Sequence, residues 1–376
     1  MNRRDLFRYA GLLGGATALA PLALGGCGFA SSEAPAAVEE SQAPPIEMKV
    51  DGDLVYFNWA DYIDPDVKAG FAKEYGVKVI ESNFDSMESM TSKLAAGNAY
   101  DVIFPSDKFA ERLVKAGKLR AIDHAQLKGA EGVFGAYAYF QNPWYDKNSA
   151  HTIPNTMYKT GVGWRKDKLG DKLTGSWQDL WDPRANGKKF LLDDRDEVLG
   201  LAALRLGYDI NTADPAQLDK MVALIKELRP NLRGFSSDTT HNLSGGSSWL
   251  QQMWSGDIVA VIGQADKPEV YGFESPSEGA PTGSDTYAIP VDAKHPGTAM
   301  LFIDYMLRPE NAIKNIEYIG YPMPIKGTEQ AYAKLVEPVP ESVVSVDDLA
   351  KAINFHNGTA AETQARDAAY TEIKAA

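Results

Sequence analysis

Two carboxylates that stand three residues apart, Asp194 and Glu197, have the spacing to act on one group together. They come at the start of a helix predicted over 197–206, where an i, i+3 spacing puts both on one face. Acids in a first helical turn stabilise the helix dipole without any ligand. Paired carboxylates can also work as acid and base on a glycoside or accept hydrogen bonds from a cation. The pair alone leaves all three roles open.

A second polar and aromatic group follows the first predicted strand. The apolar run at 54–57 is typical of a buried strand, and Trp59, Asp61 and Tyr62 come directly after it. Ligands of open α/β sheets bind beyond the carboxyl ends of the strands, so this is where residues of a cleft belong. The alternative is that the two aromatic residues are core and Asp61 is a helix cap.

The elements that must position these side chains alternate along the chain. Strands are predicted at 54–57, 77–80 and 101–104. A helix follows each strand, opening at Asp64-Pro65, Ser86 and Pro105-Ser106 and closing at Gly76, Gly97 and Gly117. This β-α-β-α-β-α order indicates a doubly wound α/β unit.

A second alternating series follows from residue 190. We predict strands at 190–192, 258–262 and 286–290, and helices at 197–206, 215–228, 249–254, 298–307 and 309–318. Two α/β lobes that face each other form a cleft that closes by hinge motion. We expect one lobe over 53–159 and 284–330 and the other over 160–283 and 331–376. The hinge would cross at 157–163, 282–285 and 327–332.

Several classes of function are disfavoured by what the chain contains. It has no Gly-x-Ser-x-Gly and no His-Glu-x-x-His motif, and its five histidines lack metal-ligand spacing. A net charge of −13 repels nucleic acid and attracts cations. We therefore expect a monomeric, non-enzymatic protein with no catalytic residue, metal, cofactor or nucleic-acid partner.

The N-terminus reads as an export signal over residues 1–26. Arg3, Arg4 and Arg8 precede an apolar run at 11–24, which is shorter than the roughly 20 residues of a membrane-spanning helix. The chain's single cysteine, Cys27, ends a Leu-Gly-Gly-Cys sequence that resembles a bacterial lipobox. We expect lipid on Cys27, a flexible tether over 27–52 and an extracytoplasmic location, with the twin-arginine and general export routes both open.

Five segments in register resemble the bacterial spermidine/putrescine-binding proteins of polyamine ABC transporters. They are 57–63, 100–106, 177–183, 191–198, and 288–290 together with 319–322. The resemblance runs in order from about Leu54 to the C-terminus. It implies a two-lobe, type II periplasmic-binding-protein fold that captures a polyamine and delivers it to an ABC permease.

The resemblance also implies a set of ligand-binding residues. Carried over position by position, they are Trp59, Asp61, Tyr62, Ser106, Asp194, Glu197, Asp285 and Tyr321. The aromatic residues would line the methylenes, the acids would pair with amines, and Ser106 would offer its hydroxyl or amide. An ammonium over a Trp face gains about 0.5–2 kcal/mol, and a hydrogen bond to a charged group contributes roughly 1.5–3 kcal/mol.

The chain departs from the family's pattern at four places. Lys108 stands where the family has Tyr, and Gly263-Gln264 and Gly283 stand where it has Trp. The family's Gln near the C-terminal helix falls at about His356. The acids are thus kept while much of the aromatic box is lost, so we expect altered specificity and a shorter or more hydrated ligand.

Other functions of the same fold stay open. The ligand could be another amine, an amino acid or an opine, and the protein could sense a polyamine without transporting it. A carboxylate ligand would need a buried arginine, for which Arg165 and Arg195 are the candidates.

Overall fold

The computed structural model describes residues 44–84, 86–97 and 99–376. The predicted signal peptide, Cys27 and the tether up to residue 43 lie outside the described residues. Within the described part, none of the helices is long and apolar enough to cross a membrane.

The strands form a mixed sheet in which β4 and β9 occupy the centre. Their bounds are β1 (Leu54–Trp59), β2 (Val79–Phe84), β3 (Val102–Ile103), β4 (Thr152–Arg165), β5 (Lys189–Leu191), β6 (Gly234–Phe235), β7 (Leu250–Trp254), β8 (Tyr271–Glu274) and β9 (Thr282–Ala288). The order is β2-β1-β3-β9-β4-β7-β5-β6, with β8 paired to β4 outside this path. Pairs β1–β2 and β1–β3 are parallel, whereas β9 runs antiparallel to both β3 and β4.

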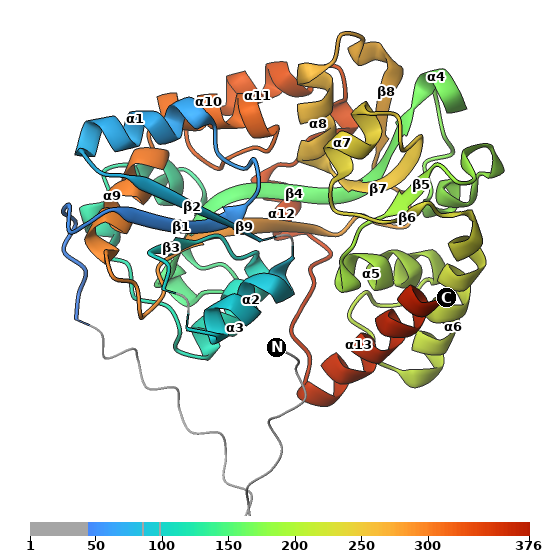
Figure 1. Ribbon diagram of the computed structural model, residues 1–376, viewed down its shortest axis with the longest axis horizontal. Coiled ribbons are helices and arrows are strands. Elements are labelled where there is room, and N and C mark those ends of the chain that lie inside the picture. The colour runs from blue at the N-terminus through green and yellow to red at the C-terminus, as the bar shows by residue number, and fades with distance from the viewer. Residues whose placement is uncertain (1–43, 85, 98) are drawn as a thin grey trace, which may run out of the picture. The chain divides into compact units, whose positions relative to one another are not determined.

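The long strand β4 belongs to both halves of this sheet (Figure 1). Its residues Thr152–Lys159 pair with β9, and its residues Thr160–Trp164 pair with β7. One half therefore contains β2, β1, β3 and β9, the other contains β7, β5 and β6, and β4 runs from one to the other.

The helices pack on the faces of the two halves. They are α1 (Pro65–Tyr75), α2 (Met87–Ala95), α3 (Asp107–Lys115), α4 (Lys166–Leu169), α5 (Arg195–Leu206), α6 (Pro215–Leu228), α7 (Thr239–Ser244), α8 (Ser255–Gln264), α9 (Pro296–Met306), α10 (Pro309–Ile319), α11 (Glu329–Val336), α12 (Val346–Ala350) and α13 (Ala360–Ala375). Helix α13 packs on α5 and α6 at the β7-β5-β6 half, while α2 and α3 lie at the half that contains β1 (Figure 1). Helix α10 contacts α8, α9 and α11.

Helix starts agree well with the capping residues in the sequence. The Asp64 carboxylate accepts hydrogen bonds from the amides of Asp66 and Val67, and Gly76 ends α1 with a φ of 67°. Ser86 caps α2 as predicted. Helix α6 begins at Pro215 and ends at Leu228, as its apolar periodicity predicts.

Two neighbouring predictions were wrong. Of residues 249–254, predicted as a helix, 250–254 form strand β7, in which Gln251 and Gln252 are fully buried. The predicted strand at 258–262 lies in α8. A short all-apolar run has no period that distinguishes a buried strand from a buried helix. Pairing of β7 with β4 and β5 decides the outcome here.

The buried apolar side chains form three clusters. One contains Leu54 and Phe302, a second contains Val198 and Met221, and a third contains Phe57 beneath α3. The segment at 332–349 contributes Tyr332, Val336 and Leu349 to the first cluster. The lobe boundaries expected from the sequence stay a prediction. Lobes are defined by the segments that move together, and a single structure does not show such motion.

Candidate functional site

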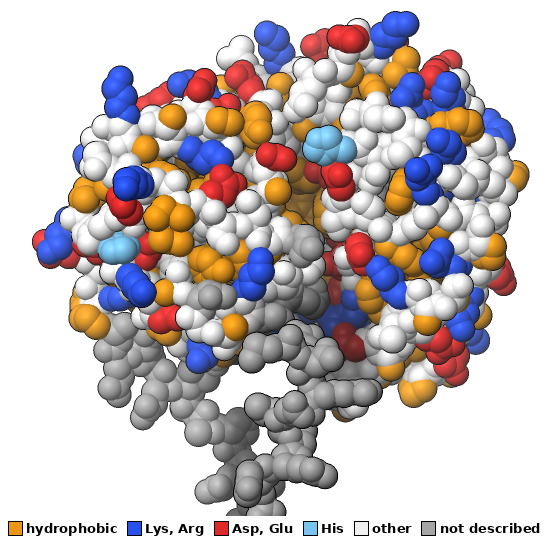
Figure 2. All heavy atoms as spheres, in the orientation of Figure 1, with side chains coloured by type: hydrophobic (Ala, Val, Ile, Leu, Met, Phe, Trp, Pro, Cys, Tyr) orange, Lys and Arg blue, Asp and Glu red, His pale blue; other side chains and the backbone are white. Residues whose placement is uncertain are grey.

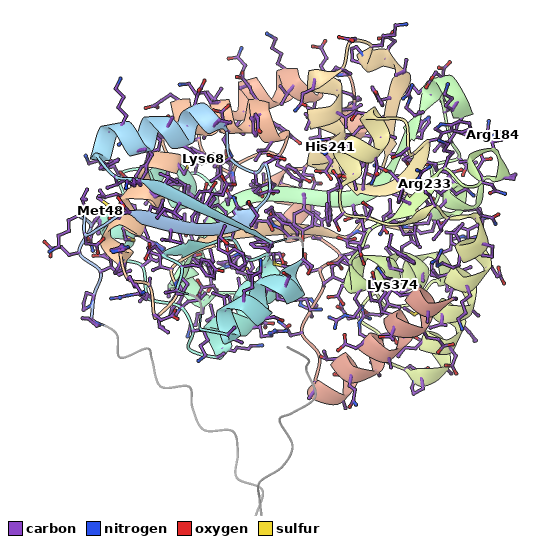
Figure 3. The ribbon with its side chains drawn as sticks, in the orientation of Figure 1. Met48, Lys68, Arg184, Arg233, His241 and Lys374 are labelled. Atoms are coloured by element: carbon purple, nitrogen blue, oxygen red, sulfur yellow. The ribbon has the colours of Figure 1, made fainter. Side chains whose placement is uncertain are left out.

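A cleft with a volume of about 1450 Å³ opens between the two halves of the sheet. The surface is hollowed there in Figure 2, below His241, which Figure 3 labels and which lines the cleft. All eight residues predicted to bind ligand line it, namely Trp59, Asp61, Tyr62, Ser106, Asp194, Glu197, Asp285 and Tyr321. They come from the end of β1 and the turn that follows it, the middle of β9, the starts of α3 and α5, and the segment after α10.

An aromatic wall is formed by Trp59 and Trp254, which stand at the C-terminal ends of β1 and β7. Their ring centroids are 6.2 Å apart, with 55° between the ring planes. The sequence reasoning missed Trp254 because it placed this residue in a helix and looked for the tryptophan near Gly263. A strand assignment for 250–254 would have put Trp254 at a strand end, where cleft residues belong.

Glu197 is the most deeply buried acid of this cleft among the eight predicted residues, with 4% of its surface exposed. Its Oε1 accepts hydrogen bonds from Thr160 Oγ1 at 2.9 Å and from Trp254 Nε1 at 3.0 Å. Its Oε2 is buried and has no hydrogen-bond partner among the described residues. Burial, reinforced by the nearby Asp194 carboxylate, raises the pKa of Glu197 to about 8.

Asp194 has both of the structural features that the sequence suggested. It is the N-cap of α5, where its Oδ1 accepts a hydrogen bond from the Glu197 amide at 3.0 Å. It also lines the cleft beside Glu197. A capping role and a cleft position are therefore compatible, because the helix that it caps begins at the cleft.

Asp285 is held by hydroxyl groups from two other segments. Its Oδ2 accepts hydrogen bonds from Tyr62 Oη at 2.8 Å and from Thr156 Oγ1 at 3.3 Å. The Asp285 backbone also forms a bridge with Ser106. Burial raises the pKa of Asp285 to about 6, although the two hydroxyl groups oppose the shift.

Asp107, the first residue of α3, is a further buried acid of the cleft that the sequence reasoning missed. Its Oδ2 accepts a long hydrogen bond from the Ser284 amide at 3.4 Å, next to Asp285. Burial raises the pKa of Asp107 to about 7. Only the fold brings this helix start to β9, so no local signal distinguished Asp107 from an ordinary first-turn acid.

Tyr321 is hydrogen-bonded to Asp257 on α8, another acid that the sequence reasoning missed. The Tyr321 hydroxyl donates to Asp257 Oδ1 at 2.6 Å, and Thr239 Oγ1 donates to the other carboxylate oxygen. Burial raises the pKa of Asp257 to about 6. Tyr62 packs edge-on against Tyr321 with ring centroids 5.4 Å apart, so this group adjoins the Asp285 group.

Asp61 and Ser106 take less buried positions. Asp61 is exposed and has a φ of 55°, a left-handed conformation that Asp adopts more readily than most residues. Ser106 stands at the N-cap position of α3, but its side chain makes no capping hydrogen bond. Its hydroxyl is thus not used by the helix it precedes.

Three basic residues in or near the cleft are engaged in ion pairs. Lys108 Nζ lies 2.6 Å from Asp196 Oδ2. Arg195 Nη2 lies 3.1 Å from the same carboxylate, and Arg165 Nε lies 2.8 Å from Asp167. The two arginines proposed for a carboxylate ligand therefore already have acidic partners.

The described residues contain no group of three or more His, Cys, Asp and Glu side chains arranged to hold a metal ion. The cleft instead is lined by carboxylates from both halves of the sheet and by two tryptophan rings. This arrangement suits an organic cation, since carboxylates accept from ammonium groups and rings cover methylenes.

Sequence comparison matches this chain to proteins that are described as solute-binding or spermidine/putrescine-binding. A sequence profile described as bacterial extracellular solute-binding protein matches residues 67–341. The chain is 34% identical over 292 residues to a spermidine/putrescine-binding periplasmic protein of Salmonella typhimurium, covering 77% of this chain and 81% of that one. It is 32% identical over 330 residues to a protein of Haemophilus influenzae with the same description, covering 86% and 89%.

A solved structure with a similar fold is described as a putative spermidine/putrescine ABC transporter from Listeria monocytogenes. Its TM-score is 0.78 at 26% sequence identity, and the match covers 86% of this chain and 99% of that chain. The match spans both halves of the sheet, and the fold is the two-lobe, type II fold of periplasmic binding proteins.

Proposed function

Because the chain belongs to the bacterial extracellular solute-binding proteins, we propose that it captures a polyamine in this cleft and delivers it to the permease of an ABC transporter. Its role is to bind a solute, and it is not an enzyme. Its working place is outside the cytoplasm, as for the periplasmic relatives.

The observation that carries this proposal is the carboxylate of Glu197. One of its oxygens is buried without a hydrogen-bond partner in the described part of the chain, in a residue that lines the cleft. A buried polar atom without a partner costs free energy, and an ammonium group would supply the missing donor. A cationic ligand would therefore remove the free-energy cost of leaving this buried oxygen without a hydrogen bond.

The arrangement of the other groups favours several ammonium groups joined by methylenes. Asp285 lies on strand β9 and Glu197 on helix α5, and both line the same cleft. Trp59 and Trp254 line it as well. Two or three such acids and two rings could reach about 8 kcal/mol, the affinity of a micromolar complex, after the costs of association.

The direct test is calorimetric titration of the purified protein with putrescine, cadaverine, spermidine and spermine, and with neutral amino acids. We expect micromolar or tighter binding of at least one polyamine and no heat from the amino acids. Glu197→Gln should abolish or strongly weaken that binding, whereas Glu227→Gln, an exposed position on α6, should leave it unchanged. Binding of neutral amino acids with silence from all four polyamines would contradict the proposal.

We expect the two lobes to close around the ligand. The proposed hinge crosses β4 at 157–163, β9 at 282–285 and the segment 327–332, and the lobes are those expected from the sequence. Support comes from β4, which pairs with β9 in one half of the sheet and with β7 in the other. Small-angle scattering should show compaction on binding, and an unchanged radius of gyration with a bound polyamine would contradict closure.

A lipid on Cys27 would hold the protein at the outer face of the membrane beside its permease. The sequence around Cys27 supports this part of the proposal. Mass spectrometry of the mature N-terminal peptide should find an acylated cysteine, and Cys27→Ser should release the protein into the soluble fraction. A mature chain that begins elsewhere, without lipid, would contradict it.

A second candidate is a binding protein of this fold for a different solute, such as another amine or an opine. The ion pairs of Arg165 and Arg195 argue against an anionic ligand. A polyamine sensor without a permease would give the same titration, and co-purification with a permease complex separates the two.

A further inference from the structure

Lys108 is a cation in a cleft whose other buried groups suit a cationic ligand. It is the second residue of α3, and only 9% of its surface is exposed. Its ammonium group turns to Asp196 on α5, at 2.6 Å. Helix α3 packs in the cluster that contains Phe57 and α5 in the cluster that contains Val198, so this ion pair spans the cleft between two separate cores.

The Asp196 carboxylate has no position left for a further donor. Its Oδ2 accepts from Lys108 and from Arg195 Nη2, and its Oδ1 accepts from Arg195 Nε and from Arg366 Nη2 at 3.2 Å each. These three cations hold the pKa of Asp196 low despite its burial. Asp196 is therefore a charged acid at the cleft that is saturated by the chain's own cations.

Lys108 also separates the cleft from a second cavity. A smaller space of about 210 Å³ lies behind it, lined by Arg195, His356 and Arg366 among others. Within the described ranges, Lys108 is the one residue that lines both spaces. Its side chain is thus the wall at which the cleft ends.

We infer that Lys108 sets the length of the ligand, so that the protein prefers diamines to triamines and tetraamines. This inference rests on the proposed function. The Lys108 ammonium takes the place at Asp196 that a ligand's third ammonium would occupy. It also blocks the passage to the second cavity.

The charges explain the direction of the selectivity. In this inference the two ammonium groups of a diamine bind at Glu197, whose Oε2 has no partner among the described residues, and at Asp285, which lines the same cleft. A third ammonium directed toward α3 would meet the Lys108 ammonium and a saturated carboxylate. Like charges brought together where water is excluded weaken binding strongly.

The test compares the full-length protein with Lys108→Ala and Lys108→Met by calorimetry with putrescine, cadaverine, spermidine and spermine. We expect the unmodified protein to bind a diamine about tenfold or more tightly than spermidine. Lys108→Ala removes both the charge and the bulk of the side chain. It should tighten spermidine binding about tenfold, while the affinity for putrescine changes by less than about threefold. Lys108→Met, which keeps the length but not the charge, should give part of this gain.

Controls keep the outcomes distinct. Lys115→Ala, at an exposed position on the same helix, should leave the ratio of diamine to triamine affinity unchanged. Lys108→Arg keeps the charge and should keep the ratio, and Lys108→Met carries the test if Lys108→Ala does not fold. The inference is overturned if the unmodified protein binds spermidine as tightly as putrescine, or if Lys108→Met and the alanine variant both keep the original ratio. Silence toward every polyamine would instead overturn the proposed function.

Discussion

At the scale of single residues, the site is built from acids that the fold makes hard to ionise. Glu197, Asp107 and Asp285 are each buried, and burial raises the pKa of all three. Hydroxyl, indole and amide donors satisfy part of each carboxylate. Under the proposed function, an ammonium group of the ligand would supply a further donor.

Exchange of Glu197 for Gln should weaken polyamine binding roughly 10- to 100-fold, because a buried hydrogen bond to a charged group contributes about 1.5–3 kcal/mol. Asp61→Asn should weaken it less than about fivefold, since exposed ion pairs contribute about 0–1 kcal/mol. Calorimetry on both variants checks the order. A larger loss of affinity in Asp61→Asn than in Glu197→Gln would contradict this order and show that the exposed Asp61 contributes more to binding.

Polyamine affinity should fall as the pH drops from 8 to 5. The carboxyl groups of Glu197, Asp107 and Asp285 take up protons near pH 8, 7 and 6, and a protonated acid loses its attraction for a cation. Each group weakens affinity by up to about tenfold per pH unit below its pKa. Titrations in buffers of different ionisation enthalpy should also detect proton release on binding, and a flat pH profile would contradict the assignment.

The stability of the ligand-free protein should show the opposite pH dependence. The folded state holds the Glu197 proton more tightly than the unfolded chain does, so this contribution is present at low pH. It is lost as the pH rises from about 4.5, the pKa in the unfolded chain, through the folded value of about 8. Urea unfolding of the protein and of Glu197→Gln at pH 5 and pH 8 measures it. The difference between the two proteins should be larger at pH 8, and equal differences would contradict it.

At the scale of elements, α8 positions the Asp257–Tyr321 group by close packing. A Cβ atom added at Gly256 would come within 2.2 Å of the Tyr321 ring, so only glycine lets the helix approach this closely. The Tyr321 hydroxyl then reaches Asp257 one residue further along the helix. Gly256 is thus the point at which α8 contacts the Tyr321 ring.

Gly256→Ala should therefore destabilise the protein by about 1–3 kcal/mol, the usual cost of overpacking, and weaken ligand binding by displacing Tyr321. Gly263→Ala in the same helix meets no atom within 4 Å and should stabilise by about 0.5–1 kcal/mol. Denaturant unfolding of both variants checks the opposite signs. Equal effects would mean that the Tyr321 contact is not tight.

An element or site residue can be predicted from the sequence when the contacts that determine it are between residues close together in the chain. The ends of α1 and α6 follow from caps and periodicity, and the eight residues assigned by resemblance do line one cleft. The exchange of helix and strand at 249–262 arose because β7 is defined by partners on β4 and β5. Asp107, Trp254 and Asp257 were missed for the same reason, since each becomes a cleft residue only through contacts distant in sequence.

At the scale of the whole molecule, the described body keeps its ligand site between separate hydrophobic clusters. The Lys108–Asp196 pair joins two of these clusters directly, since α3 packs in one and α5 in the other. A ligand that contacts both sides would bind the folded protein and not the unfolded chain. Its binding free energy therefore adds to the stability of the whole body.

A polyamine at 100 times its dissociation constant should stabilise the protein by about 2.7 kcal/mol and raise its melting temperature. Differential scanning calorimetry at increasing polyamine concentration checks this. Glu197→Gln should show a much smaller rise at the same concentrations. A rise of equal size in that variant would place the ligand elsewhere.

The position of β9 also governs the order in which the protein can fold. This strand covers Thr282–Ala288 and lies between β3 and β4, whose residues come more than a hundred positions earlier in the chain. The loop entropy of such distant pairings is lost before their contacts form, so sheets of this kind close slowly compared with their helices. A nascent chain that ends before Thr282 lacks the strand that joins β3 to β4. The middle of its sheet can be completed only after about three quarters of the chain has been made.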